Sequence, residues 1–169
     1  MGYALLEQKT AGIHQRLRPR AFIVQEAATQ RSAVVVITDT GLVTQAIHQA
    51  VLARLKTRYG ELYHAQNVLI SATHTHAGPG GYSHHALYNI TILGFQKKTF
   101  EAIVDGIVEA VDRAHASRAP GDILLNQGEL TNASRNRSAA AFRRNAAADR
   151  AVFPQEIDPL MSVLTFTQG

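Results

Sequence analysis

The sequence contains no cysteine among its 169 residues. This absence excludes disulfide bonds, thiolate metal ligands and a cysteine nucleophile. Any transition-metal site must therefore be built from histidine, aspartate, glutamate or tyrosine. The chain also lacks a run of the ~20 apolar residues that a membrane-spanning helix requires. Its first segment, from Met1 to Arg20, is too polar for the core of a signal peptide, so export is not expected from the residues given.

Charge is moderate, because charged residues make up 18% of the chain and hydrophobic residues 46%. These proportions are ordinary for a soluble globular protein of one domain. The formal net charge is +4, and many arginines lie in the last third of the chain. A nucleic-acid site would call for a basic helix with interleaved aromatic residues, and none is evident. We therefore interpret the surplus as a solvated face and expect no nucleic-acid partner.

The first half of the chain predicts a strand, a helix and a second strand. Residues 32–38 are rich in β-branched side chains and lead into a turn, as a buried strand does. From Leu42 to Tyr59, apolar residues recur every three or four positions, which is typical of an amphipathic helix. Asp39 or Thr40 is expected to cap this helix, and Gly60 to end it. Residues 67–72 form a second short apolar run.

This order predicts a βαβ unit and hence an α/β fold with a mixed or largely parallel sheet. A second helix is expected over residues 97–117, and further strands at 123–125 and 161–166. The alanine-rich segment 132–150 reads as a long active-site loop or a short helix. Ligands of such sheets gather beyond the carboxyl ends of the strands.

Two histidines, His74 and His76, follow the second predicted strand and precede a glycine-rich loop. Side chains two residues apart in a regular strand lie on the same face of the sheet. At an irregular strand end the two side chains can point in other directions. We expect one ring to bind a metal and the other to contact substrate or to stabilise charge; a bend at the strand end would bring both rings to one metal. Neutral imidazole is a strong zinc ligand and suits proton transfer near neutral pH.

The remaining polar candidates have simpler interpretations. His84 and His85 are expected on a loop at the rim of a pocket. Asp39 is either a carboxylate that orients a metal ligand or a helix cap.

Several segments of the chain resemble the neutral/alkaline non-lysosomal ceramidase family, and they occur in the family's order. The resemblance extends over nearly the whole chain. The segments are Gln8–His14, Ala72–Gly81, Leu93–Phe100, Ile103–Ile107, Asn132–Ser138 and Ile157–Leu164.

The resemblance implies hydrolysis of the amide bond of ceramide (N-acylsphingosine) to sphingosine and a fatty acid, with one Zn²⁺ ion. It implies that His74 binds the zinc and that His76 and Arg137 act on the substrate side, where they stabilise the oxyanion. Zinc polarises a carbonyl group and lowers the pKa of its bound water towards ~7. The family is typically secreted or membrane-associated, so contact with a membrane surface is expected, while the compartment of this chain is not specified.

The family enzymes are several times longer, and their remaining zinc ligands (a histidine, a glutamate and a tyrosine) lie beyond the matched region. Residues 1–169 are therefore expected to be the N-terminal fragment of a ceramidase-like catalytic domain, an incomplete portion of a larger α/β domain. Recruitment of His84 or His85 with Glu129 is one way to complete a zinc site within the chain. The alternatives are a non-catalytic truncated paralogue that binds lipid or a partner chain, and an unrelated metal hydrolase. Exposed sheet edges and apolar surface predict self-association.

Overall fold

The computed structural model describes residues 5, 7 and 9–168, so that Gln8 of the first family-like segment lies outside the described residues. Contacts divide the chain into two compact units, one reaching to Arg118 and the other beginning at Ala119. In the described part of the chain, no helix is both long and apolar enough to cross a membrane.

The first unit is built on a three-stranded mixed sheet with the strand order β1–β2–β3. β1 pairs antiparallel with β2, and β2 pairs parallel with β3. The connection from β2 to β3 runs through α1, so the predicted βαβ unit and the α/β class are confirmed. The elements are β1 (Pro19–Gln25), β2 (Ser32–Thr38), α1 (Gln45–Tyr59) and β3 (Val68–Ala72), followed by a 3₁₀ helix η1 (Ala86–Ile92) and α2 (Lys97–Ala116).

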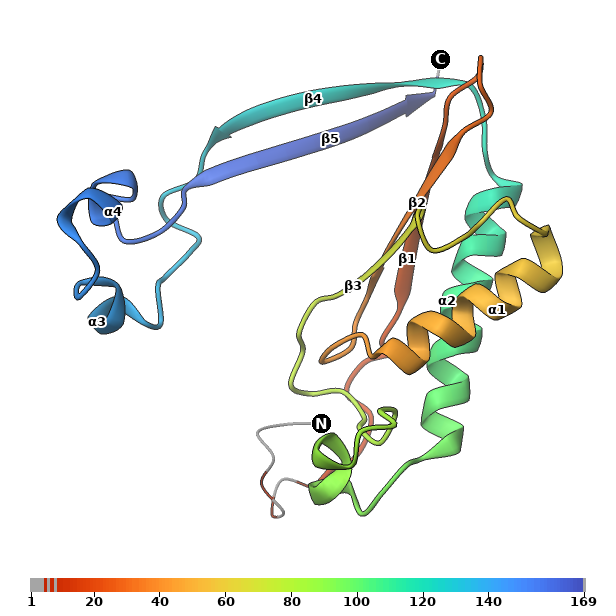
Figure 1. The fold of residues 1–169 in the computed structure, drawn as a ribbon, viewed down its shortest axis with the longest axis horizontal. Coiled ribbons are helices and arrows are strands. Elements are labelled where there is room, and N and C mark those ends of the chain that lie inside the picture. Colours follow the sequence, from red (N-terminus) through yellow and green to blue (C-terminus); the bar gives the residue numbers. More distant parts are fainter. Residues whose placement is uncertain (1–4, 6, 8, 169) are drawn as a thin grey trace. The chain divides into compact units, whose positions relative to one another are not determined.

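Two helices, α1 and α2, cover one face of this sheet (Figure 1). Alternation along β2 places Val34 and Val36 against them, while Val35 is exposed on the other face. Each helix contributes an apolar stripe to the same core, including Val51 of α1 and Val104 of α2. Burial of these stripes supplies the main driving force for the fold, roughly 25 cal/mol per Å² of apolar surface.

The boundaries of α1 differ from the prediction. The side chain of Thr44 accepts a hydrogen bond from the backbone N–H of Ile47, so Thr44 is the N-cap. The expectation that Asp39 or Thr40 caps the helix is therefore wrong, since the turn after β2 continues to Thr44 before the helix begins. The expected end is confirmed, because Gly60 adopts φ 61° and donates to the carbonyl of Lys56.

The second unit is an antiparallel hairpin of β4 (Gly121–Glu129) and β5 (Leu160–Gln168), with two short helices between the strands. The helices are α3 (Ala139–Phe142) and α4 (Ala147–Val152), so the segment 132–150 contains short helices rather than one open loop. Both predicted strands are confirmed and are longer than expected. All of their residues are exposed, and self-association through their apolar side chains stays a prediction.

Candidate functional site

The backbone bends sharply at His74, two residues after β3 ends at Ala72. His74 adopts φ 60°, in the left-handed region that residues other than glycine seldom occupy. Such a conformation costs on the order of 1–3 kcal/mol and is found preferentially at functional sites. The strand end delivers His74 to the edge of the sheet, and the bend then sets the direction of its side chain.

One ring nitrogen of His74 has a fixed partner. Its Nδ1 lies 2.6 Å from the carbonyl oxygen of Gly41, in the connection between β2 and α1. A carbonyl oxygen only accepts, so Nδ1 must carry the proton and donate it. In the neutral ring Nε2 is then unprotonated, with its lone pair available. A backbone carbonyl that orients a histidine in this way is the usual partner of a metal-binding imidazole.

The two histidine rings face each other. The Nε2 atoms of His74 and His76 are 3.2 Å apart, and the ring planes are perpendicular with centroids separated by 4.8 Å. Because Nε2 of His74 is the acceptor, His76 donates its Nε2–H to it. The bend anticipated as an alternative therefore occurs, and the two rings converge on one point. The separation also resembles the ~3.3 Å between two nitrogen ligands of a tetrahedral zinc with ~2.0–2.1 Å bonds.

Tyr82 links the loop that follows His76 to the connection between β2 and α1. Its side chain is fully buried, and its hydroxyl accepts from the N–H of Leu42 at 3.3 Å and lies 3.2 Å from the carbonyl of the same residue. Thr44 also donates its hydroxyl to the carbonyl of Tyr82 at 3.3 Å. Burial raises the pKa of the Tyr82 phenol. No motif in the sequence marks Tyr82, although it joins the loop after His76 to the loop that supplies Gly41.

The carboxylate of Asp39 is hydrogen-bonded to arginines at the start of β1 rather than to a histidine. Its carboxylate accepts from the backbone N–H of Arg18 at 3.1 Å and from the guanidinium of Arg20 at 2.9 and 3.3 Å. The hydrogen bond from Arg20 is the main reason that the pKa of Asp39 is lowered. These contacts tie β1 to the end of β2, and they do not support the interpretation that Asp39 orients a metal ligand.

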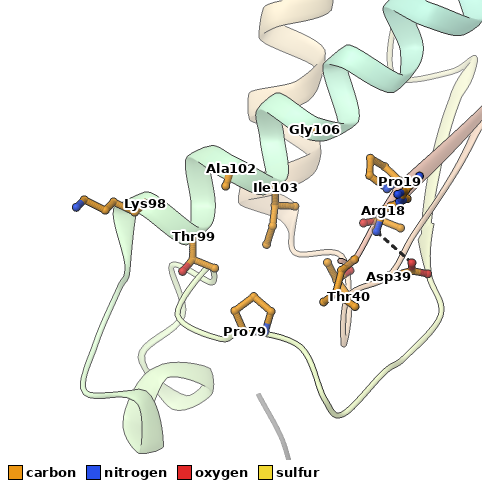
Figure 2. A pocket seen from close by; sticks show the side chains of 12 residues that line it. Arg18, Pro19, Asp39, Thr40, Pro79, Lys98, Thr99, Ala102, Ile103 and Gly106 are labelled. Atoms are coloured by element: carbon orange, nitrogen blue, oxygen red, sulfur yellow. Dashed lines mark hydrogen bonds between the residues drawn. The ribbon is translucent and has the colours of Figure 1, made fainter. Parts of the chain in front are cut away.

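A pocket of about 410 Å³ lies beside these loops. Figure 2 shows Pro79 on one side of the pocket and Ala102 and Ile103 of α2 on the other. Thr40, which precedes Gly41, also lines it, whereas neither His74 nor His76 does. The pocket therefore adjoins the connection that orients His74 without containing the ring.

The other histidine candidates are arranged for packing. His84 stacks on Phe100 at a centroid distance of 5.5 Å and meets the edge of Phe95 at 4.7 Å. His85 lies beside the ring of Tyr88. Both occupy exposed loop positions, as expected, but neither lines the pocket described above. Among the residues with defined positions, no three His, Asp or Glu side chains come together as a metal site, so recruitment of His84 or His85 with Glu129 has no structural support.

Arg137 belongs to the second unit, between β4 and α3, and is exposed. The side chain of the neighbouring Asn136 holds the local chain in place. Its Nδ2 donates to the backbone carbonyl of Glu156 at 3.0 Å, and its Oδ1 accepts from the backbone N–H of Ser138 at 2.8 Å. Arg143 adds an ion pair with the carboxylate of Glu156 at 2.6 Å. The segment that carries Arg137 is thus secured on both sides.

The first unit has an α/β fold in which two histidine rings approach each other just beyond the end of β3. All 169 residues match the family described as "Neutral/alkaline non-lysosomal ceramidase, N-terminal", and the chain belongs to this family. It is 54% identical to the neutral ceramidase of Pseudomonas aeruginosa over 169 residues and 48% identical to that of Mycobacterium tuberculosis over 171.

Solved structures show the same relationship. A structure described as "Ceramidase complexed with C2" matches 98% of this chain with a TM-score of 0.92 and 55% sequence identity. The crystal structure of the neutral ceramidase from Pseudomonas aeruginosa matches with a TM-score of 0.89. The chain spans 25% and 27% of the lengths of the two curated relatives and 26% of each solved chain.

Proposed function

We propose that this chain carries the first part of a zinc-dependent amidohydrolase site that cleaves ceramide to sphingosine and a fatty acid. The observation that supports this most is the orientation of His74. The Gly41 carbonyl fixes the proton on Nδ1 and leaves the Nε2 lone pair for a ligand bond. The names of the relatives, which are neutral ceramidases, point to ceramide as the substrate.

The donor set at His74 fits zinc as one ligand of a larger set. Neutral imidazole nitrogen suits this ion, and a catalytic zinc site normally has three protein ligands. When bound, zinc would supply Lewis-acid polarisation of the amide carbonyl. A group of three candidate ligands is absent from the residues whose positions are described, so further ligands have to come from elsewhere.

His76 would act on the substrate. In the structure, His76 donates Nε2–H to the nitrogen of His74 that would bind the metal. Once that lone pair is engaged, the same N–H is released for another acceptor, and the oxygen of the scissile amide is the nearest chemical fit. A donor directed at the oxygen where negative charge develops lowers the barrier to acyl transfer. Arg137 is proposed to add a cationic donor for the same oxygen.

A fluorescent short-chain ceramide tests this function. The chain is joined to the remainder of the neutral ceramidase of Pseudomonas aeruginosa, in place of the 25% of that protein that it matches. We expect the joined protein with added Zn²⁺ to release fatty acid, and its His74→Ala variant to lose the release. His64→Ala is the matched control, because His64 is exposed and the described hydrogen bonds of its ring are to the neighbouring Gln66. It should behave as the parent does.

The outcomes separate the catalytic function from its alternative. A folded joined protein that binds zinc but releases no fatty acid would overturn catalysis by this chain and favour the non-catalytic paralogue that binds lipid or a partner chain. Absence of zinc binding by the folded joined protein would overturn the metal-dependent function as a whole. Equal loss of turnover in the His64→Ala control would contradict the assignment of His74.

A further inference from the structure

The connection between β4 and β5 holds Glu156 in a backbone conformation that its residue type disfavours. Glu156 adopts φ 61°, in the left-handed region that glycine occupies without strain. Strain of this kind persists only where the surrounding structure holds the residue in place. Contacts with other parts of the connection must therefore fix Glu156.

Three groups of Glu156 are bonded within the connection. Its backbone N–H donates to the carbonyl of Phe153 at 2.8 Å. Its carboxylate accepts from Nε of Arg143 at 2.6 Å and from Nη2 of the same residue at 3.0 Å. Its backbone carbonyl accepts from Nδ2 of Asn136 at 3.0 Å. Glu156 thus joins the end of α3 and the segment after α4 to the loop that carries Arg137.

The contact between Glu156 and Arg143 is directional. Two N–H···O bonds from one guanidinium fix the orientation of a carboxylate, which a single contact between charges does not. The same hydrogen bonds lower the pKa of Glu156, because they favour its charged form. The side chain of Arg143 is 64% exposed, and exposed ion pairs contribute little to folding stability. The main consequence of this contact is therefore that it orients Glu156.

Asn136 transmits this constraint to Arg137. While Nδ2 of Asn136 is bonded to Glu156, its Oδ1 accepts from the backbone N–H of Ser138 at 2.8 Å. Asn136 and Ser138 are the two neighbours of Arg137, so the backbone of Arg137 lies within the turn that this side chain closes. The guanidinium of Arg137 is exposed and forms no ion pair within the described part of the chain. The backbone of Arg137 is thus held, while no carboxylate of these residues neutralises its charge.

We propose that Glu156 is a positioning residue for Arg137, and that it acts through Asn136 while Arg143 holds its carboxylate. This inference rests on the proposed function, in which Arg137 is a cationic donor for the oxygen of the scissile amide. Such a donor is effective only where it meets the developing negative charge, and a misplacement of about 1 Å costs on the order of 100-fold in rate. A glutamate at a left-handed position has a reason in this arrangement, because its carboxylate orients the carbonyl that Asn136 contacts.

Amide hydrogen exchange measures the constraint without turnover. In the 169-residue chain, the N–H of Ser138 reports its bond to Asn136. Glu156→Gly removes the carboxylate but still permits the left-handed backbone, and it should raise the exchange rate of this N–H about five- to tenfold. Arg143→Gln should have the same effect. Glu156→Gln retains one acceptor for Arg143 and should give an intermediate rate.

The matched control is Arg144→Gln. Arg144 follows Arg143 directly, is exposed and forms no ion pair among the residues with described positions. The exchange of Ser138 in this variant should equal that in the parent. Parental exchange in both Glu156→Gly and Arg143→Gln would overturn the proposal. Where Glu156→Gly fails to fold, Arg143→Gln still decides, because it changes a side chain that is mostly exposed.

Steady-state kinetics of the protein joined to the remainder of the Pseudomonas aeruginosa enzyme test the effect on turnover. We expect Glu156→Gly to lower kcat about tenfold or more with KM nearly unchanged, because a bond to the oxyanion forms only in the transition state. Glu156→Gln should recover part of this loss. Adding Glu156→Gly to Arg137→Ala should lower kcat no further, since a positioning residue has no effect once the group it positions is removed.

The kinetic outcomes distinguish failure of this proposal from failure of the proposed function. Loss of kcat in Arg137→Ala but not in Glu156→Gly would overturn positioning by Glu156 and leave the proposed function standing. An equal further loss in the double variant would assign Glu156 to general stability, and would also overturn the proposal. Unchanged kcat in Arg137→Ala, or no turnover by the joined parent, would overturn the proposed role of Arg137 and the assignment of Glu156 with it.

Discussion

The Nε2 atoms of His74 and His76 lie 3.2 Å apart, although the two residues are separated by only one position in an H-x-H segment. The left-handed conformation of His74 produces this approach, since it ends the regular path of β3. The carbonyl of Gly41 then fixes which nitrogen of His74 is free to accept. Two roles for the rings follow from this single contact: a ligand atom on His74 and a donor on His76.

Removal of the Tyr82 hydroxyl should destabilise the two loops that position His74 and His76. Tyr82→Phe deletes the bonds to Leu42 and leaves its backbone groups in need of new partners. We expect a loss of about 1–2 kcal/mol in the free energy of unfolding, measured by urea denaturation. Tyr88→Phe is the control, because the Tyr88 ring is half exposed. Equal stability of Tyr82→Phe and the parent would show that these bonds do not hold the two loops.

Two glycines should respond to alanine in opposite directions. Gly81 has φ 83°, and an added Cβ would lie 2.5 Å from Cγ of Gln96 and 3.2 Å from its backbone nitrogen. Gly81→Ala should therefore cost about 1–3 kcal/mol. Gly106 lies within α2, and a Cβ there would be 3.7 Å from Pro19, an ordinary contact. Gly106→Ala should gain about 0.5–1 kcal/mol from helix propensity. Thermal unfolding of both variants decides, and a stabilised Gly81→Ala would contradict the described loop.

His115 should make the first unit sensitive to acid. Arg118 can only donate, so Nε2 of His115, 3.1 Å from its guanidinium, accepts, and Nδ1 lies 2.6 Å from the hydroxyl of Tyr63. Burial, and then the charge of Arg118, lower the pKa of His115 below its ordinary 6.5. As the pH falls, His115 therefore takes up a proton at a higher pH in the unfolded chain than in the folded chain. This part of the stability is complete above pH 6.5 and is lost as the pH falls below it.

The His115→Gln variant tests this dependence, because glutamine still accepts a hydrogen bond but does not titrate. Its free energy of unfolding should vary less with pH below 6.5 than that of the parent. His64→Gln, a change at an exposed histidine, should leave the slope unchanged. Identical slopes in the parent and His115→Gln would contradict the prediction.

Asp39 should also contribute stability that is lost in acid, but at a lower pH than the contribution of His115. The hydrogen bond from Arg20 lowers the pKa of Asp39 below its ordinary 3.8, so the folded state keeps the carboxylate charged to lower pH than the unfolded state does. Its contribution is present above pH 3.8 and is lost as the pH falls through the lowered value. Asp39→Asn should be less stable than the parent at neutral pH, and urea denaturation should show the difference shrinking in acid. A constant difference would contradict the pairing with Arg20.

Much of the first unit could be predicted from sequence because its signals are local. The β-branched run 32–38 and the apolar stripes of α1 and α2 appear directly in the order of residues. β1 was missed, since Pro19–Gln25 has a short and weaker alternation whose pairing with β2 depends on contacts distant in sequence. The cap of α1 was misplaced for a related reason: several residues near the turn can cap, and Tyr82 helps to select Thr44.

The candidate site could be predicted only in part. The H-x-H segment and the family motifs identify His74, His76 and Arg137 as residues of interest. A bend at the strand end was one of two alternatives, but the left-handed conformation of His74 that produces it has no sequence signal, because non-glycine residues rarely adopt its φ value. The contact with Gly41 is equally hidden, since it joins residues 33 positions apart through a backbone carbonyl.

The protonation state of the His74 ring decides whether its Nε2 atom can bind zinc. Long-range ¹H–¹⁵N correlation spectra of the imidazoles report which nitrogen carries the proton, and His74→Ala assigns the signal. At a mildly alkaline pH we expect His74 to be protonated on Nδ1, and its Nε2 resonance to shift when Zn²⁺ is added, while the resonances of His64 stay in place. A His74 ring protonated on Nε2, or an Nε2 resonance that Zn²⁺ leaves unchanged, would contradict the proposal that this atom is a zinc ligand.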